Sequence, residues 1–151
     1  FATVFRQTTM YRFEQDLHAA ARAKGELTSD EIGTLWRKHQ TNMFGNSVKL
    51  TKDYDIWWSY ISHFIHTPFY VYAYAFGELL TLSLFATYKK RGESMVEDYL
   101  AFLEAGGSKS PDELLKPFGI NLRDKNFWLG GIKIIEEMVK EAKELHAQIE
   151  K

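Results

Sequence analysis

The fold class is decided by the stretch DKNFWLGGIKIIEEMVKEAKELHAQIEK, residues 124–151. Its apolar residues recur every three or four positions, and lysine and glutamate fill most of the positions between them. The recurring set is Trp128, Ile132, Ile135, Met138, Val139, Ala142, Leu145 and Ile149. This period predicts one amphipathic helix from about Asp124 to the end of the chain, laid on the core by a single apolar stripe.

Helix signals of the same kind run through the first third of the chain. A helix is expected from about Thr3 to Lys24, ended by Gly25, because glycine readily adopts the backbone conformation that closes a helix. Thr28 can cap the next helix while Glu31 reaches back to the cap residue, and that helix should end near Gly45. Both segments therefore have a defined start or stop in the sequence itself.

The middle of the chain is expected to pass from a loop over residues 46–53 into a short helix or buried segment from Tyr54 to Ile65. Thr67 is then expected to cap a long helix that reaches about Arg91, with Pro68 at its first position, which proline suits. The second half of that helix is apolar on nearly all sides, which predicts burial against several neighbours. Its apolar residues are Leu79, Leu80, Leu82, Leu84 and Phe85.

Two shorter helices are predicted before the last one. Residues 93–104 repeat the apolar period and are followed by a glycine pair. Ser110-Pro111-Asp112-Glu113 combines a cap, a proline and two acids at the positive end of the helix dipole, and the helix should end at Pro117 or Gly119. No Asn-Gly or Asp-Gly hairpin separates alternating strands. The sequence predicts an all-α protein, a single domain over residues 1–151 with about six to seven helices.

Charge and composition exclude several classes of protein. The net charge is −1 and both signs are interspersed, so no basic stripe is available to bind nucleic acid. The absence of cysteine excludes disulfides, thiolate zinc sites and a cysteine nucleophile, and it fits a reducing, cytoplasmic location. The longest apolar stretch, residues 64–76, is interrupted by polar residues and is too short to cross a bilayer. We expect a soluble protein with neither nucleic acid nor membrane as partner.

The five histidines do not form a complete metal site in the sequence. None begins the pattern His-Glu-x-x-His, which places two imidazoles and a general base on one helical face. His63 and His66 are three positions apart, and Glu14 and His18 are four apart, so either pair can in principle share a metal. No acid lies close in sequence to His63 and His66 as a third ligand. We expect helix-surface or hydrogen-bonding roles for both pairs, with metal binding as the less favoured alternative.

The strongest chemical cluster lies in residues 62–78, which place two imidazoles and three phenols within twelve positions. These groups are His63, His66, Tyr70, Tyr72 and Tyr74. They can donate hydrogen bonds at neutral pH, which suits them to gripping a peptide carbonyl or stabilising an oxyanion. Aromatic residues make up 15% of the chain, however, and a core of aromatic rings with satisfied hydroxyls is the alternative that the residues leave open.

The same segment resembles a known family. In oligoendopeptidase F it reads roughly Pro-His-Phe-Tyr-x-x-Pro-Phe-Tyr-Val-Tyr-Gln-Tyr-Ala-x-Gly, which is similar here to His63-Phe64, Pro68-Phe69-Tyr70-Val71-Tyr72, Tyr74-Ala75 and Gly77. Upstream, the family's Phe-Arg-Gln-Thr helix is matched by Phe5-Arg6-Gln7-Thr8 with Phe13-Glu14. Downstream, its later motifs are matched in order by Phe102-Leu103, Gly106-Gly107-Ser108, Pro111, Glu113-Leu114-Leu115, Gly119, Trp128 and Gly130. The resemblance covers nearly the whole chain.

The resemblance implies an oligoendopeptidase F-type zinc metallopeptidase of the M3 family, a mostly helical hydrolase with a deep channel that cleaves short peptides. In such enzymes a His and a Tyr of this segment stabilise the tetrahedral oxyanion, which assigns those two catalytic roles to His63 and Tyr72. Tyr70, His66 and Tyr74 are expected as substrate contacts. The segment departs from the family pattern at three positions, occupied here by Ser62, Ile65 and Ala73.

The resemblance also implies that much of the active site lies outside this chain. The family's two zinc-binding histidines, its catalytic Glu and its third ligand all precede the position of Phe1. We therefore expect the C-terminal portion of a peptidase whose intact form binds zinc, while this chain alone binds none and cleaves no peptide. Its expected partners are short peptides and the missing N-terminal portion, and exposed apolar walls predict self-association. The alternative is a stand-alone helical module for peptide binding or protein interaction, without catalysis.

Overall fold

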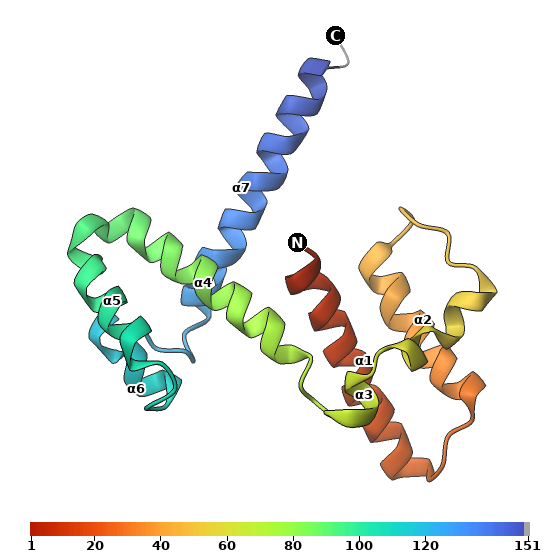
Figure 1. The fold of residues 1–151 in the computed structure, drawn as a ribbon. Helices are drawn as coiled ribbons and strands as arrows, with labels where there is room; N and C mark the ends of the chain where they lie inside the picture. Colours follow the sequence, from red (N-terminus) through yellow and green to blue (C-terminus); the bar gives the residue numbers. More distant parts are fainter. Residues whose placement is uncertain (150–151) are drawn as a thin grey trace. The chain divides into compact units, whose positions relative to one another are not determined.

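A computed structural model describes residues 1–149, and every regular element in that range is a helix (Figure 1). The all-α prediction is confirmed. The chain divides into two compact units, residues Phe1–Gly77 (unit 1) and Glu78–Lys151 (unit 2). The prediction of a single domain stays a prediction. No helix in the described part of the chain is long and apolar enough to cross a membrane.

Unit 1 begins with α1 (Ala2–Lys24) and α2 (Ser29–Phe44), which pack against each other (Figure 1). α1 ends at Gly25, whose φ of 89° is costly for other residues, as its sequence position predicts. The predicted capping box of α2 is present: the Glu31 backbone N–H donates to the Thr28 hydroxyl at 3.3 Å, and the Thr28 N–H donates to the Glu31 carboxylate at 2.9 Å. These ends were predictable because the residues that form them are neighbours in sequence.

The core of unit 1 is aromatic. Its buried residues are Met10, Phe13, Trp36 and Val71. The Phe13 ring lies 5.1 Å from Trp36 and 5.2 Å from Phe64 between centroids, and both distances are typical of favourable edge or tilted contacts. The 3₁₀ helix η1 (Lys52–Tyr60) packs on α2, and the short α3 (His63–His66) follows it. Some of the aromatic residues therefore form a core, which was the alternative that the sequence left open.

The predicted start of the long fourth helix is wrong. α4 runs from Tyr72 to Arg91, so Pro68 does not open it and Thr67 does not cap it. Instead the Tyr70 N–H donates to the Thr67 carbonyl at 3.2 Å, which makes residues 67–70 a turn. Phe69, the third residue of the turn, has φ = 62°, and proline in second place with a positive φ in third place is typical of a type II turn. Pro68 shapes this turn rather than a helix.

Unit 2 holds the rest of α4 and the elements that follow it. They are η2 (Gly92–Met95), α5 (Val96–Ala105), α6 (Pro111–Leu115), η3 (Lys116–Phe118) and α7 (Lys125–Ile149). The predicted start of α6 is confirmed, with a capping box between Ser110 and Glu113. Its buried apolar cluster is aliphatic apart from one ring and consists of Leu84, Met95, Leu115 and Phe118.

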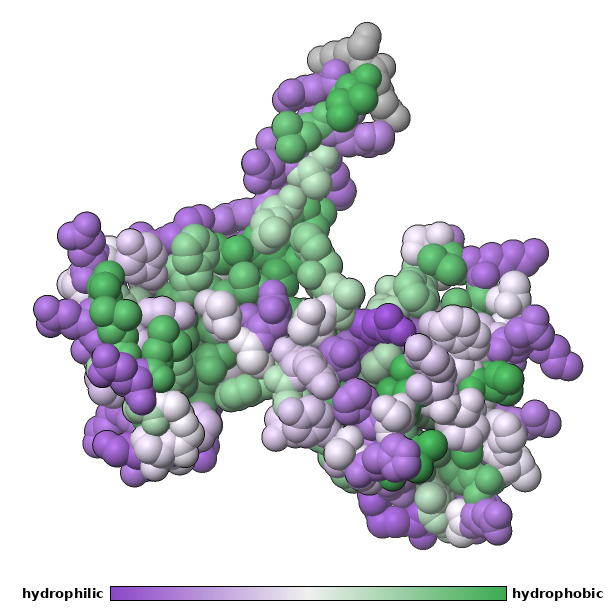
Figure 2. Space-filling view, viewed as in Figure 1, coloured by the Kyte–Doolittle hydropathy of each residue, from purple (hydrophilic) through white to green (hydrophobic). Residues whose placement is uncertain are grey.

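α7 meets α4 at a close approach of two backbones. A Cβ placed on Gly131 would lie 2.6 Å from the Ser83 Oγ and 3.1 Å from the Leu79 carbonyl oxygen, so only glycine fits there. Beyond this crossing the predicted packing of α7 is wrong. Ile135 is buried, but Met138 is 49% exposed, and Leu145 and Ile149 are more exposed still. The sequence period predicted the apolar stripe, but no described element of unit 2 covers its second half, which carries hydrophobic atoms at the surface in Figure 2.

The predicted burial of α4 on nearly all sides is also not met in the described residues. Leu84 is buried at 4% exposure, but Phe85 remains 46% exposed. The physical reason is that a helix needs neighbours on every side to bury an apolar circumference, and unit 2 supplies them on only part of it.

Candidate functional site

Three of the five predicted site residues come together in unit 1. The His63 Nε2 lies 3.2 Å from the Tyr74 hydroxyl oxygen, within hydrogen-bonding distance. The Tyr70 ring stacks on the imidazole with 6.0 Å between centroids and an angle of 5° between planes. Tyr74 meets both rings edge-on, 5.8 Å from His63 and 5.6 Å from Tyr70. These three residues form the His63 cluster.

The His63 cluster is assembled from three consecutive elements. His63 is the first residue of α3, Tyr70 closes the turn at residues 67–70, and Tyr74 lies in the first turn of α4. The turn is what reverses the chain between the two helices, and the Tyr70 carbonyl then accepts from the Ala73 N–H at 2.9 Å, where α4 begins. Phe69, at the strained third position, costs roughly 1–2 kcal/mol relative to an ordinary backbone conformation.

The other two predicted site residues lie outside the cluster. Tyr72 is 50% exposed, and its ring rests against Tyr11 of α1 with 5.7 Å between centroids. His66 is exposed at the last position of α3. The two residues to which the sequence assigned catalysis thus have different neighbours: His63 contacts Tyr74 and Tyr70, whereas Tyr72 contacts Tyr11 of α1.

Glu14 is a feature of this site that sequence reasoning undervalued. Its side chain is fully buried in α1, and its Oε1 accepts a hydrogen bond from the Phe69 backbone N–H at 2.6 Å. The His18 Nε2 lies 4.0 Å from the same oxygen, so the pair that the sequence suggested is close in space. The available signal was position: Glu14 occupies the apolar face of α1 beside Met10 and Phe13, where a carboxylate is unusual.

The chemistry of the cluster is that of hydrogen-bond donors on a fixed frame. An imidazole held between a phenol hydroxyl and a stacked ring can present its remaining ring N–H to a carbonyl oxygen. Within residues 1–149 no three His, Asp or Glu side chains converge to hold a metal ion. The described residues therefore do not by themselves offer a zinc site, and the ligands that the family resemblance implies are expected to precede the position of Phe1.

The resolved pKa shifts lie away from the cluster and mark structural pairs. Hydrogen bonds from Lys38 and then His39 hold the pKa of Asp16 below its ordinary value of 3.8. The Lys38 Nζ and the His39 Nε2 lie 2.9 Å and 2.8 Å from the same Asp16 oxygen. This triad joins α1 to α2 within unit 1, so it steadies the pair of helices that supports the site.

Comparison with known proteins places the chain in a family. The sequence profile of peptidase family M3 matches residues 1–134. The oligopeptidase PepF of Bacillus subtilis is 32% identical over 143 residues, which cover 95% of this chain and 21% of that protein. An oligoendopeptidase F homolog of Borreliella burgdorferi is 31% identical over 144 residues, or 95% of this chain and 24% of that protein. The chain thus spans less than a quarter of the length of these relatives.

A solved structure agrees with the sequence comparisons. A crystal structure assigned as a peptidase from Chlamydophila abortus superposes with a TM-score of 0.81 at 30% identity, covering 93% of this chain and 24% of that one. The all-α fold described above therefore has a counterpart within that longer chain. Because the family profile matches most of its length, the chain belongs to peptidase family M3, with oligoendopeptidase F proteins among its relatives.

Proposed function

We propose that this chain supplies the substrate-carbonyl and oxyanion contacts of a zinc metalloendopeptidase that hydrolyses short peptides. The observation that carries the proposal is the His63 cluster, in which the imidazole is hydrogen-bonded to Tyr74 and stacked on Tyr70. Donors that are fixed before the substrate arrives stabilise a developing oxyanion without reorganising, and that is the property the cluster supplies.

The proposed roles follow the environment of each side chain. His63 donates to the oxyanion because both neighbours restrain its ring, and Tyr74 orients it through the 3.2 Å bond while contacting substrate at its edge. Tyr72 is the second oxyanion donor, since its half-exposed ring is held by Tyr11. Tyr70 and the exposed His66 contact the substrate backbone, for which an imidazole and a phenol are suitable partners.

The zinc and its ligands are proposed to lie in the larger share of the peptidase that this chain does not span. The relatives are four to five times as long as the region they share with it, and the described residues hold no cluster fit for a metal. On this proposal the chain alone neither binds zinc nor cleaves peptides, and its partners are short peptides and the N-terminal portion of the same peptidase in the cytoplasm.

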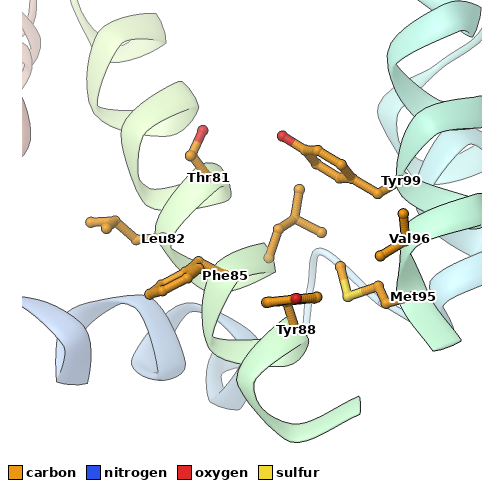
Figure 3. Close-up of a pocket in the computed structure, with 8 residues that line it drawn as sticks. Thr81, Leu82, Phe85, Tyr88, Met95, Val96 and Tyr99 are labelled. Atoms are coloured by element: carbon orange, nitrogen blue, oxygen red, sulfur yellow. The ribbon is translucent and has the colours of Figure 1, made fainter. Parts of the chain in front are cut away.

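The surface of unit 2 supports a partner in the rest of the peptidase. A hollow of about 430 Å³ lies between α4 and the start of α5, and its lining is apolar except for a threonine and two tyrosine hydroxyls (Figure 3). Its lining residues are Thr81, Leu82, Leu84, Phe85, Tyr88, Met95, Val96 and Tyr99. An apolar surface of this kind is suited to packing against other protein, and in the isolated chain it promotes self-association.

The test is a kinetic comparison in the full reading frame that encodes this chain. His63→Ala is expected to lower kcat for an internally quenched short peptide by roughly 10²–10³-fold, because it removes one oxyanion donor, with a smaller change in KM. His146→Ala, on α7 in unit 2, is the matched control and is expected to leave both parameters near those of the unmodified enzyme. An unchanged kcat for His63→Ala would refute the proposal, and an enzyme without peptidase activity would favour a non-catalytic binding module.

A further inference from the structure

The turn at residues 67–70 connects the elements of the site and contains one residue, Phe69, in a backbone conformation that its own side chain disfavours. His63 precedes it, Tyr70 closes it, and Tyr72 and Tyr74 follow it, so the turn sets how the residues before and after it lie relative to one another. Phe69 lies in the left-handed region with φ = 62°, which a side chain other than glycine adopts only when its surroundings enforce it. Pro68 and the hydrogen bond from the Tyr70 N–H to the Thr67 carbonyl shape the turn from within, while the partner of the Phe69 N–H lies outside it.

Glu14 is the group that meets the strained residue. Its Oε1 accepts from the Phe69 N–H at 2.6 Å, although the two residues are 55 positions apart in the chain. The carboxylate is fully buried, and its second oxygen has no hydrogen-bond partner in the described part of the chain. Burying a carboxylate is unfavourable unless its hydrogen bonds compensate, so an apolar side chain of the same size would be the less costly occupant. What the carboxylate adds is the bond to Phe69.

Two further contacts hold the same turn against α1. The His18 ring, one helical turn beyond Glu14, lies on the Phe69 ring with 4.6 Å between centroids. Val71, the residue that follows the turn, is 1% exposed and belongs to the core cluster with Met10. Glu14 thus holds the backbone of the turn at Phe69. His18 packs on the Phe69 ring, and the core of unit 1 holds the next side chain but one, that of Val71.

We infer that Glu14 is a positioning residue, whose buried carboxylate holds the Phe69 backbone and so sets where the His63 cluster and Tyr72 face the substrate. The structural part of this inference stands on contacts within unit 1. Its consequence for catalysis rests on the proposed function of His63 and Tyr72.

Two substitutions separate the hydrogen bond from the packing. Glu14→Met removes the acceptor and keeps a side chain of similar length, whereas Glu14→Gln keeps a carbonyl oxygen that can accept from the Phe69 N–H. Amide hydrogen exchange, measured by NMR on the 151-residue chain, reports the bond directly. Glu14→Met should speed exchange at Phe69 by roughly 10-fold or more, with changes below about 3-fold in the middle of α2, and Glu14→Gln should restore most of the protection.

The unmodified chain provides a test that does not depend on any variant folding. Its Phe69 amide should exchange at least about 10-fold more slowly than the amide of an exposed loop residue such as Lys49. An unprotected Phe69 amide would overturn the inference. So would Glu14→Met exchange that is unchanged at Phe69, or that rises equally throughout unit 1, because the latter would mean that Glu14 contributes only general stability.

The kinetic readout distinguishes this inference from the proposed function. In the full reading frame, Glu14→Met should lower kcat by roughly 10-fold or more with little change in KM, and Glu14→Gln should stay within about 3-fold of the unmodified enzyme. If His63→Ala leaves kcat unchanged while hydrogen exchange at Phe69 responds as expected, the proposed function is refuted, but the role of Glu14 in holding the Phe69 backbone stands. If His63→Ala abolishes activity but Glu14→Met does not alter kcat, the positioning role fails alone.

Discussion

The two units of this chain bury different kinds of side chain. Unit 1 packs rings around Phe13 and Trp36 and also buries Glu14, His39 and Gln40. Unit 2 buries an apolar cluster around Leu115, with Ser83 as the one buried polar residue in its described part. Buried polar groups are costly unless they have partners, so their concentration in unit 1 indicates a unit built to hold particular groups in place.

The two units also differ in the side chains that they expose. Unit 1 presents phenols and imidazoles around residues 63–74, which suit a polar ligand such as a peptide backbone. Unit 2 presents apolar groups on α4, α5 and the second half of α7, including Phe85, Leu100, Leu103 and Leu145. The difference teaches that the proposed site chemistry is confined to unit 1, whereas exposed apolar side chains occur in both units, Ile56 and Trp57 of unit 1 among them.

The largest expected effect on the free energy of unfolding comes from removing a buried side chain from the core of either unit. Phe13→Ala should lower the free energy of unfolding by about 3–5 kcal/mol and Leu115→Ala by about 2–5 kcal/mol, because each side chain is completely buried. Urea denaturation followed by fluorescence and circular dichroism measures both. A cost below about 1 kcal/mol for either variant would mean that its unit lacks the close-packed core described above.

A smaller effect is expected where α7 crosses α4 in unit 2. Gly131→Ala forces a methyl group to within 2.6 Å of the Ser83 Oγ and should cost about 1–3 kcal/mol of unfolding free energy. Gly130→Ala is the matched control, since its Cβ would meet Ala86 at an ordinary 3.5 Å and alanine favours a helix. Equal stability of the two variants in thermal melts would show that the helices do not approach closely at Gly131.

The smallest expected effect concerns the ion pairs of unit 1. Asp16→Asn should lower stability at pH 7 by about 0.2–1 kcal/mol, because the carboxylate is 41% exposed and solvent screens its contacts. The folded-state pKa of Asp16 lies below its ordinary 3.8 because of Lys38 and His39, so its stabilisation is present above that value and is lost as the pH falls through the lower folded pKa.

Denaturation of Asp16→Asn and of the unmodified chain at several pH values tests whether the stabilisation by Asp16 is lost at acidic pH. The difference between them should shrink as the pH falls through the acidic range in which the Asp16 carboxylate gains its proton. A control substitution, Glu26→Gln in the exposed segment after α1, should show no such trend. A difference that grows as the pH falls through this acidic carboxylate range would contradict the assigned contacts.

Whether a feature of the fold could be predicted depends on how far apart in the sequence its interacting residues lie. The C-terminal end of α1 follows from Gly25, and the starts of α2 and α6 follow from Thr28 and Ser110. The partners of these residues lie within a few positions, so all three features were predicted from sequence. The start of α4 was not. The partner of the Phe69 N–H is Glu14, 55 positions away, and no local pattern reports a bond of that span.

The site shows the same limit. The sequence suggested the segment and its five candidate residues, but their grouping depends on the turn at residues 67–70, which lies where the first turn of a helix was expected. The close pair His63 and Tyr74 and the separate contact of Tyr72 with Tyr11 could be found only from the structure. The exposed half of α7 likewise depends on which neighbours are present, and periodicity alone does not report that.

One measurement tests the central claim, that unit 1 supplies oxyanion donors, most directly. In the full reading frame that encodes this chain, Tyr72→Phe removes a single oxygen atom and should lower kcat for a short peptide by roughly 10²-fold with little change in KM. Tyr60→Phe, an exposed tyrosine of η1, is the matched control and should leave kcat unchanged. A Tyr72→Phe enzyme with the kcat of the unmodified protein would contradict the account.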